Sequence, residues 1–211
     1  PYTTLFRSQW YQPLDDGRLL VVPTLGVQRL AVLDGTTGTL SDIEVVGQAA
    51  VRLGPVRGNR VLAVIGGGRL PTGLRLVDLT SGATEDVRLS RDDLPAPAYL
   101  PTAEPMTFAG PGGREGHALV YAPATPDFVA PAGELPPFLA FVHGGPTAHE
   151  LPGVDLVKAF FTSRGIGIVD VNYGGSTGYG REYRERLRGQ WGVVDVKDTV
   201  AAVVGLADAG L

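Results

Sequence analysis

Short apolar segments alternate with turn residues through the first ninety residues of the chain. The most apolar of them span 18–22, 28–33, 61–65 and 74–79, and glycine, aspartate, threonine and asparagine lie between them. Short segments bounded by such residues are typical of β-strands joined by tight turns. The pattern therefore predicts an all-β region at the start of the chain.

One piece of this region repeats with a shift of 44 residues. Residues 32–38 read Val-Leu-Asp-Gly-Thr-Thr-Gly, and residues 76–82 read Leu-Val-Asp-Leu-Thr-Ser-Gly. In both copies a strand ends at an aspartate that can bond the amides of the next turn. A hairpin repeat of roughly 40–50 residues is typical of a β-propeller blade, and an unspecified β-sandwich is the alternative. Because fewer than three blades cannot close a ring, we expect only part of a propeller here.

A proline-rich linker separates this region from the rest of the chain. Its four prolines lie at positions 95, 97, 101 and 105. Two short strands are expected at 105–108 and 117–122, and a proline-rich loop over 123–137. We therefore expect two domains, residues 1–95 and residues 96–211.

The second domain is expected to be of the α/β class. A continuous apolar run at 138–142 is typical of a strand buried on both faces, and a second apolar run covers 166–173. Segments with helical periodicity alternate with these runs, at 154–163, 181–188 and 193–209. Strands and helices in this order predict a parallel sheet covered by helices.

The composition of the chain argues against several classes of function. The chain has 211 residues and a net charge of −4, and the acidic excess lies in residues 96–211. A nucleic-acid-binding surface is normally basic, so we expect no nucleic-acid partner. No run of about 18 apolar residues occurs, so no membrane span is expected. The absence of cysteine excludes disulfides, thiolate zinc sites and a cysteine nucleophile; with no visible leader, it favours a cytoplasmic location.

A glycine-rich loop with catalytic potential directly follows the first apolar run. It reads His143-Gly144-Gly145-Pro146. Glycines at the carboxyl end of a strand expose backbone N–H groups, as an oxyanion hole requires. In α/β-hydrolases one oxyanion donor comes from such a His-Gly-Gly loop. The loop therefore predicts an oxyanion site, and an ordinary strand-to-helix turn is the alternative.

A second glycine-rich string, at 174–178, matches the G-x-S-x-G pattern of a nucleophile elbow. An elbow passes straight from strand to helix, but here Gly180 intervenes before the next helix. The triad histidine should also follow the serine along the chain, whereas the last histidine is His149. We therefore interpret Ser176 as a loop residue and keep an esterase that uses it as an alternative.

Neither a metal ion nor a cofactor is expected. His117, His143 and His149 stand without carboxylates at metal-ligand spacing. The chain has no Gly-Lys-Ser/Thr of a phosphate-binding loop, and no G-x-G-x-x-G opens a helix after the first parallel strand.

Three longer strings resemble the prolyl oligopeptidase family of serine peptidases. They are residues 141–146 (Phe-Val-His-Gly-Gly-Pro), 164–173 (Arg-Gly-Ile-Gly-Ile-Val-Asp-Val-Asn-Tyr) and 175–180 (Gly-Ser-Thr-Gly-Tyr-Gly). The branch looks like the acylaminoacyl-peptidase and dipeptidyl-aminopeptidase-like enzymes. The resemblance continues through Arg181-Glu182-Tyr183 and from Trp191 to Asp198. It covers the chain from about residue 104 onward; before that, only the propeller architecture agrees.

The resemblance implies a peptidase that cleaves short peptides by acyl transfer. It implies that the amide of Gly145 is an oxyanion donor and that His143 helps to shape the same loop. Family members place the nucleophilic serine on the strand after the helix that ends this chain, so the nucleophile, acid and base are expected beyond Leu211. Many relatives carry arginine at the position of Gly174. Because the arginine is absent here, a role of this position in substrate binding or loop anchoring is in doubt.

The expected fold is therefore mixed: the C-terminal part of a β-propeller followed by the N-terminal half of an α/β-hydrolase domain. The chain is expected to be truncated at both ends and inactive alone. Short peptides are the expected substrates of the parent protein, with no nucleic-acid, membrane or cofactor partner. A complete small esterase and a non-enzymatic β-rich binding module remain as alternatives.

Overall fold

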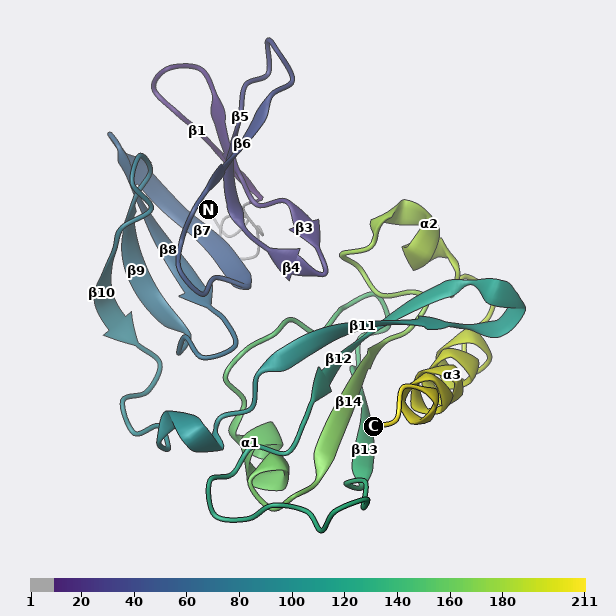
Figure 1. Ribbon diagram of the computed structural model, residues 1–211. Helices are drawn as coiled ribbons and strands as arrows, with labels where there is room; N and C mark the ends of the chain where they lie inside the picture. The colour runs from purple at the N-terminus through teal and green to yellow at the C-terminus, as the bar shows by residue number, and fades with distance from the viewer. Residues whose placement is uncertain (1–9) are drawn as a thin grey trace. The chain divides into compact units, whose positions relative to one another are not determined.

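A computed structural model describes residues 10–211 of the chain. The chain divides into two compact units, Pro1–Leu94 and Pro95–Leu211 (Figure 1). The boundary falls at the first of the four linker prolines. Within residues 10–211, no helix is long and apolar enough to cross a membrane.

Between residues 10 and 94, the first unit forms two four-stranded antiparallel sheets and a short hairpin. One sheet contains, in spatial order, β1 (Tyr11–Pro13), β2 (Leu19–Val21), β5 (Leu30–Leu33) and β6 (Leu40–Ile43). The other is a simple meander of β7 (Ala50–Arg57), β8 (Arg60–Gly66), β9 (Gly73–Asp78) and β10 (Thr84–Leu89). The hairpin consists of β3 (Thr24–Leu25) and β4 (Val27–Gln28). Four antiparallel strands are also the content of a propeller blade.

The repeated turns have the same hydrogen bonds in both copies. Asp34 and Asp78 each accept hydrogen bonds from the backbone N–H groups two and three residues further on, at 2.8–3.1 Å. Gly38 and Gly82 follow at φ +73° and +71°, where a side chain is strained. The repeat in the sequence thus corresponds to one turn built twice.

The two sheets of this unit share one apolar core. Both sheets contribute buried side chains to it, among them Leu20, Leu30, Ile43, Val61, Ile65 and Val77. The backbone also comes close at Gly82, where an added Cβ would lie 1.9 Å from the Glu44 carbonyl oxygen. Gly82 is therefore required for its small size as well as for its backbone conformation.

The second unit contains a four-stranded sheet in the order β11 (Ala103–Ala109), β12 (Glu115–Tyr121), β14 (Gly167–Asn172) and β13 (Phe138–Val142). Among these described strands only β13 and β14 are parallel; the other two pairs are antiparallel. The prediction of a parallel sheet is therefore correct for one pair only. β11 and β12 form a hairpin, which makes them antiparallel.

Burial differs sharply between β13 and β14. All six residues of β14 are buried, because the strand lies between β12 and β13. In the part of the chain that the structure describes, β13 lies at the edge of the sheet, and its residues are half-buried or exposed, with Val142 at 55%. The prediction that 138–142 is buried on both faces is wrong here because β13 has a neighbour on one side only.

Helices lie against the sheet (Figure 1), and alternate residues of β14 belong to two different apolar cores. Val169 and Val171 of β14 belong to the core that includes α3 (Val194–Asp208). Ile168 of β14 faces the other way and shares a smaller core with Phe161 of α1 (Leu156–Thr162). A third helix, α2 (Gly180–Glu185), follows β14. α1 and α3 lie inside the segments where helical periodicity predicts them, and α2 begins one residue before its predicted segment and ends three residues before the end of it.

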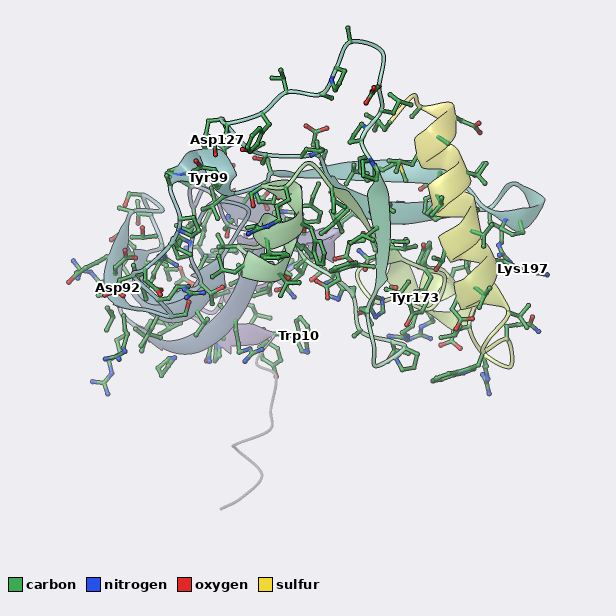
Figure 2. The ribbon with its side chains drawn as sticks, turned by 90° about the horizontal axis from the view of Figure 1, so that it is seen from below. Trp10, Asp92, Tyr99, Asp127, Tyr173 and Lys197 are labelled. Carbon is green, nitrogen blue, oxygen red and sulfur yellow. The ribbon has the colours of Figure 1, made fainter. Side chains whose placement is uncertain are left out.

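The proline-rich loop between β12 and β13 is held by contacts at its start. Tyr99 and Asp127 lie together in Figure 2, where the tyrosine hydroxyl donates to the carboxylate at 2.8 Å. The amide of Ala124 donates to the carbonyl of Thr162 at the end of α1, at 3.0 Å. These contacts connect the loop to the rest of its unit.

The two repeated glycines provide a matched pair of substitutions. Gly38→Ala is expected to cost about 1–2 kcal/mol, because alanine is strained at positive φ but meets no atom within 4 Å. Gly82→Ala adds the collision with Glu44 and is expected to cost roughly 1–3 kcal/mol more. Chemical denaturation of both variants measures the difference. Equal losses would contradict the steric requirement at Gly82.

Candidate functional site

Two loops leave the sheet side by side at the carboxyl ends of β13 and β14. Val142 pairs with Val171 in the parallel register, so the residues that follow the two strands are neighbours. We call residues 143–150 the histidine loop and residues 173–179 the serine loop. In open α/β sheets ligands bind at the carboxyl ends of the strands. The candidate site is therefore built from these two loops.

His143 connects the start of the histidine loop to the serine loop. Its Nε2 atom lies 2.7 Å from Oγ of Ser176. Its ring stacks on Tyr173, with ring centroids 4.5 Å apart and planes 17° from parallel. The Tyr173 hydroxyl donates to the His143 carbonyl oxygen at 3.1 Å. Sequence reasoning gave His143 a role in shaping its own loop and missed this contact, which the parallel pairing of the strands creates.

Ser176 is completely buried, with an exposed fraction of 0%. Its hydroxyl donates to the carbonyl oxygen of Tyr173 at 2.8 Å. The direction of the 2.7 Å contact with His143 Nε2 depends on the histidine tautomer, whereas the bond to Tyr173 and the complete burial of Ser176 do not. A serine nucleophile needs access to substrate and a base that takes its proton. The geometry therefore favours the interpretation of Ser176 as a loop residue.

Gly145 lies in an exposed turn of the histidine loop. Its φ is +58°, and its carbonyl accepts a hydrogen bond from the amide of Ala148. Among residues 10–211, no hydrogen-bond acceptor is recorded for the Gly145 N–H. An exposed amide without an internal partner has the property that an oxyanion donor requires. The role of this amide stays a prediction.

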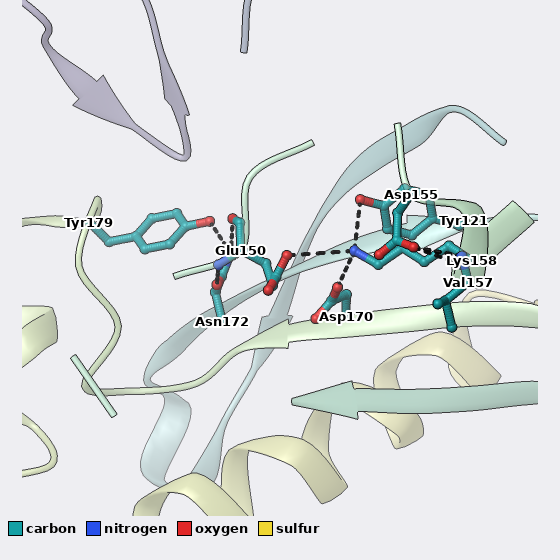
Figure 3. Close-up of polar contacts among 8 residues, drawn as sticks. All are labelled: Tyr121, Glu150, Asp155, Val157, Lys158, Asp170, Asn172 and Tyr179. Carbon is teal, nitrogen blue, oxygen red and sulfur yellow. Dashed lines mark hydrogen bonds and ion pairs between the residues drawn. The ribbon is translucent and has the colours of Figure 1, made fainter. Parts of the chain in front are cut away.

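The far end of the histidine loop is held by Asn172, the last residue of β14. Its Oδ1 accepts the N–H of Glu150 at 2.8 Å, and its Nδ2 donates to the Glu150 carbonyl at 3.1 Å. Nδ2 also donates to the Tyr179 hydroxyl at 3.1 Å (Figure 3). One side chain thus satisfies both backbone groups of Glu150 and reaches across to the serine loop.

Two further contacts join the middles of the two loops. The amide of Thr177 donates to the carbonyl of Ala148 at 3.0 Å. His149 Nδ1 lies 2.9 Å from the Thr177 hydroxyl oxygen. Burial, together with the nearby His143, lowers the pKa of His149, which keeps its ring neutral in this contact.

A buried charged cluster supports the site from the α1 face of the sheet. Lys158 Nζ lies 2.5 Å from Oδ2 of Asp170, 3.6 Å from Oε2 of Glu150 and 3.4 Å from the Tyr121 hydroxyl (Figure 3). Burial alone would lower the pKa of Lys158, but the two carboxylates outweigh it and raise that pKa. Burial and the charge of Asp170 raise the pKa of Glu150. Sequence reasoning missed this cluster; the signal was a carboxylate inside an apolar run.

Asp198 of α3 anchors the start of the serine loop. Its Oδ2 accepts the N–H of Gly174 at 2.8 Å, and its Oδ1 lies 3.2 Å from Nη2 of Arg114. A Cβ at Gly174 would stand 2.9 Å from both Asp198 Oδ2 and a methyl group of Val194. An arginine at this position would need a shift of its neighbours. Sequence reasoning missed the bond from Asp198 to this loop.

The described residues offer no metal site: between residues 10 and 211, no three His, Cys, Asp or Glu side chains gather closely enough to hold an ion.

Comparison with known proteins identifies the family. The family profile described as "Prolyl oligopeptidase family" matches residues 152–211. A puromycin-hydrolysing peptidase of Mycobacterium tuberculosis is 48% identical, with a TM-score of 0.89 over 97% of this chain. The chain belongs to the prolyl oligopeptidase family. The match to the solved peptidase includes both units of this family member, not only the part after residue 104.

Other relatives of this family member are also peptidases. A puromycin hydrolase, solved in complex with PGG, is 44% identical with a TM-score of 0.87 over 96% of the chain. Dipeptidyl peptidase family member 6 of Caenorhabditis elegans is 32% identical over 108 residues, which are 49% of this chain and 13% of that protein. The chain covers 31% of the length of each of these two solved puromycin-hydrolysing relatives.

The chain has two lysines, and they allow a controlled test of the buried cluster. Lys158→Met is expected to lower the free energy of unfolding by about 3–5 kcal/mol, because it leaves the buried Asp170 carboxylate unpaired. Lys197 is exposed on α3 (Figure 2), so Lys197→Met is expected to change it by less than about 0.5 kcal/mol. Urea denaturation of both variants measures the difference. A similar effect in the two variants would show that the cluster does not stabilise the unit.

Proposed function

We propose that this chain is part of a serine-type peptidase that hydrolyses short peptides through an acyl-enzyme. The observation that carries the proposal is the 48% identity, across 97% of this chain, to a puromycin-hydrolysing peptidase. Because the likeness covers both units, it supports a common architecture as well as common chemistry. Puromycin, which holds an amino acid in amide linkage, is a further substrate to test, and the cytoplasm remains the proposed location.

In this proposal residues 1–95 are the last blades of a β-propeller, and residues 96–211 are the first half of an α/β-hydrolase domain. The two antiparallel sheets with a repeated turn support the first assignment. The parallel pair β13 and β14, with a glycine-rich loop at each carboxyl end, supports the second. The open edge at β13 is where a further parallel strand would add to the sheet.

The chemical contribution of this chain is an oxyanion donor. The Gly145 N–H would donate a hydrogen bond to the substrate carbonyl oxygen and so stabilise the negative charge that develops there when a serine attacks. His143 would shape the loop that carries this amide. The nucleophile, the acid and the base would come from residues outside this chain, in keeping with its coverage of 31% of the solved relative.

One contact favours a second candidate function, a small esterase that uses Ser176. His143 Nε2 stands 2.7 Å from the serine hydroxyl, as a base should. Against this, Ser176 is completely buried, and its hydroxyl has the Tyr173 carbonyl as acceptor. His143 also has Gly144 O beside Nδ1, at 3.1 Å, where a triad would place a carboxylate.

A fluorophosphonate probe separates the two candidates, because it reacts with activated serine nucleophiles. The 211-residue chain is expected to take up no probe. The protein that contains this chain, at its full length, is expected to be labelled at a serine outside the chain and to hydrolyse short peptides. Peptide mapping by mass spectrometry locates the label.

Labelling at Ser176 that disappears in Ser176→Ala would establish the esterase instead. A full-length protein that is neither labelled nor active on short peptides would overturn the peptidase proposal.

The oxyanion role of Gly145 has its own test in the full-length peptidase. Gly145→Ala is expected to lower kcat about 100-fold with little change in KM, because alanine is strained at a φ of +58° and the amide leaves its position. Gly144, whose φ is not positive, provides the control, and Gly144→Ala is expected to retain most of the activity. Equal kcat values for the two variants would exclude a special role for the Gly145 amide.

A further inference from the structure

We propose that Asn172 and Ser176 are positioning residues, which hold the histidine loop and thereby the Gly145 amide in one conformation. The inference rests on the proposed function, because that function gives the Gly145 amide its purpose. Both side chains are completely buried, so they act through the loop backbone and not on a substrate.

The side chain of Asn172 makes the two hydrogen bonds to the Glu150 backbone that a neighbouring strand would make in a sheet. The backbone of Glu150 lies outside any strand or helix. The side-chain amide of Asn172 supplies one acceptor and one donor to it, at 2.8 and 3.1 Å. The second Nδ2 hydrogen donates to the Tyr179 hydroxyl. The side-chain amide of Asn172 therefore has three hydrogen-bond partners, which fix its orientation. This contact fixes the position of the chain five residues after Gly145.

Ser176 fixes the chain two residues before Gly145. Its hydroxyl oxygen lies 2.7 Å from Nε2 of His143 and donates to the carbonyl of Tyr173 at 2.8 Å. Its own amide donates to the same carbonyl at 2.9 Å, which closes a tight turn. The turn is also closely packed, because a Cβ on the preceding Gly175 would lie 2.7 Å from the Leu187 side chain.

The two contacts matter because the segment between them contains two consecutive glycines, Gly144 and Gly145. Two consecutive glycines have more backbone freedom to lose than any other pair of residues. An oxyanion donor lowers the barrier only if it is in place before charge develops, with no reorganisation at the moment of reaction. The serine loop and Asn172 extend directly from β14, all of whose residues are buried. Asn172 and the serine loop therefore provide a rigid support that holds the exposed turn at Gly145 in place.

The test uses Ser176→Ala and Asn172→Asp in the protein at its full length. The first removes the hydroxyl, and the second keeps the shape of the side chain but removes the Nδ2 donor. The control is Ser163→Ala, which removes a hydroxyl whose partners lie at the end of α1: it donates to the carbonyl of Phe160 and accepts from Nη1 of Arg164. Hydrogen exchange of residues 144–150 and steady-state kinetics on a short peptide are measured for each variant.

In both variants we expect exchange of residues 144–150 to rise about 10-fold or more, while exchange of β14 stays unchanged. We also expect kcat to fall roughly 10- to 100-fold while KM changes less than about threefold. Ser163→Ala is expected to match the parent protein in both measurements. A general loss of structure would instead raise exchange throughout the unit.

Unchanged exchange of residues 144–150 in both variants overturns the proposal. Raised exchange with unchanged kcat in an active enzyme overturns the positioning role. If the parent protein has no peptidase activity, the proposed function fails, and the exchange measurement alone decides whether the two residues hold the loop. If Ser176→Ala does not fold, Asn172→Asp decides the outcome.

Discussion

Parallel pairing of β13 with β14 is the constraint on which the second unit depends. Parallel strands end at the same edge of a sheet, so residues 33 positions apart, His143 and Ser176, become neighbours. Six polar contacts, made by backbone and side-chain groups, then join the histidine loop to Asn172 and the serine loop. Among the strands of residues 10–211, β13 has only β14 as a neighbour, so its other edge is open and its apolar residues are half-buried or exposed.

β14 combines two environments in one strand. Its valines pack against α3 in an apolar core, whereas Asp170 and Asn172, on the other face, are buried with polar partners. Burying a carboxylate is costly unless a charge and hydrogen bonds compensate it. Lys158 supplies the charge from α1, and Glu150 links the same lysine to the histidine loop. The polar cluster and the candidate site are therefore one connected network.

The sequence predicted local features well and long-range contacts poorly. The repeated Asp and Gly positions fixed the turns at Asp34 and Asp78 because their hydrogen bonds are local. The Gly-Gly sequence likewise indicated an exposed loop after β13. By contrast, the burial of β13 depends on a neighbouring strand, and the partners of Asp170 and Asp198 lie far away along the chain. Periodicity carries no information about such partners. A carboxylate inside an apolar run shows only that a partner must exist.

The two faces of β14 have different consequences for sequence change. On the α3 face, apolar side chains can be exchanged one at a time if the total volume is kept. On the α1 face, a change at Asp170 leaves Lys158 with only the more distant carboxylate of Glu150, and a change at Asn172 frees the backbone of Glu150. These residues are energetically coupled, so their substitutions are not additive. Among related sequences, Lys158 and Asp170 should therefore be kept or replaced together, while the valines beside them drift independently.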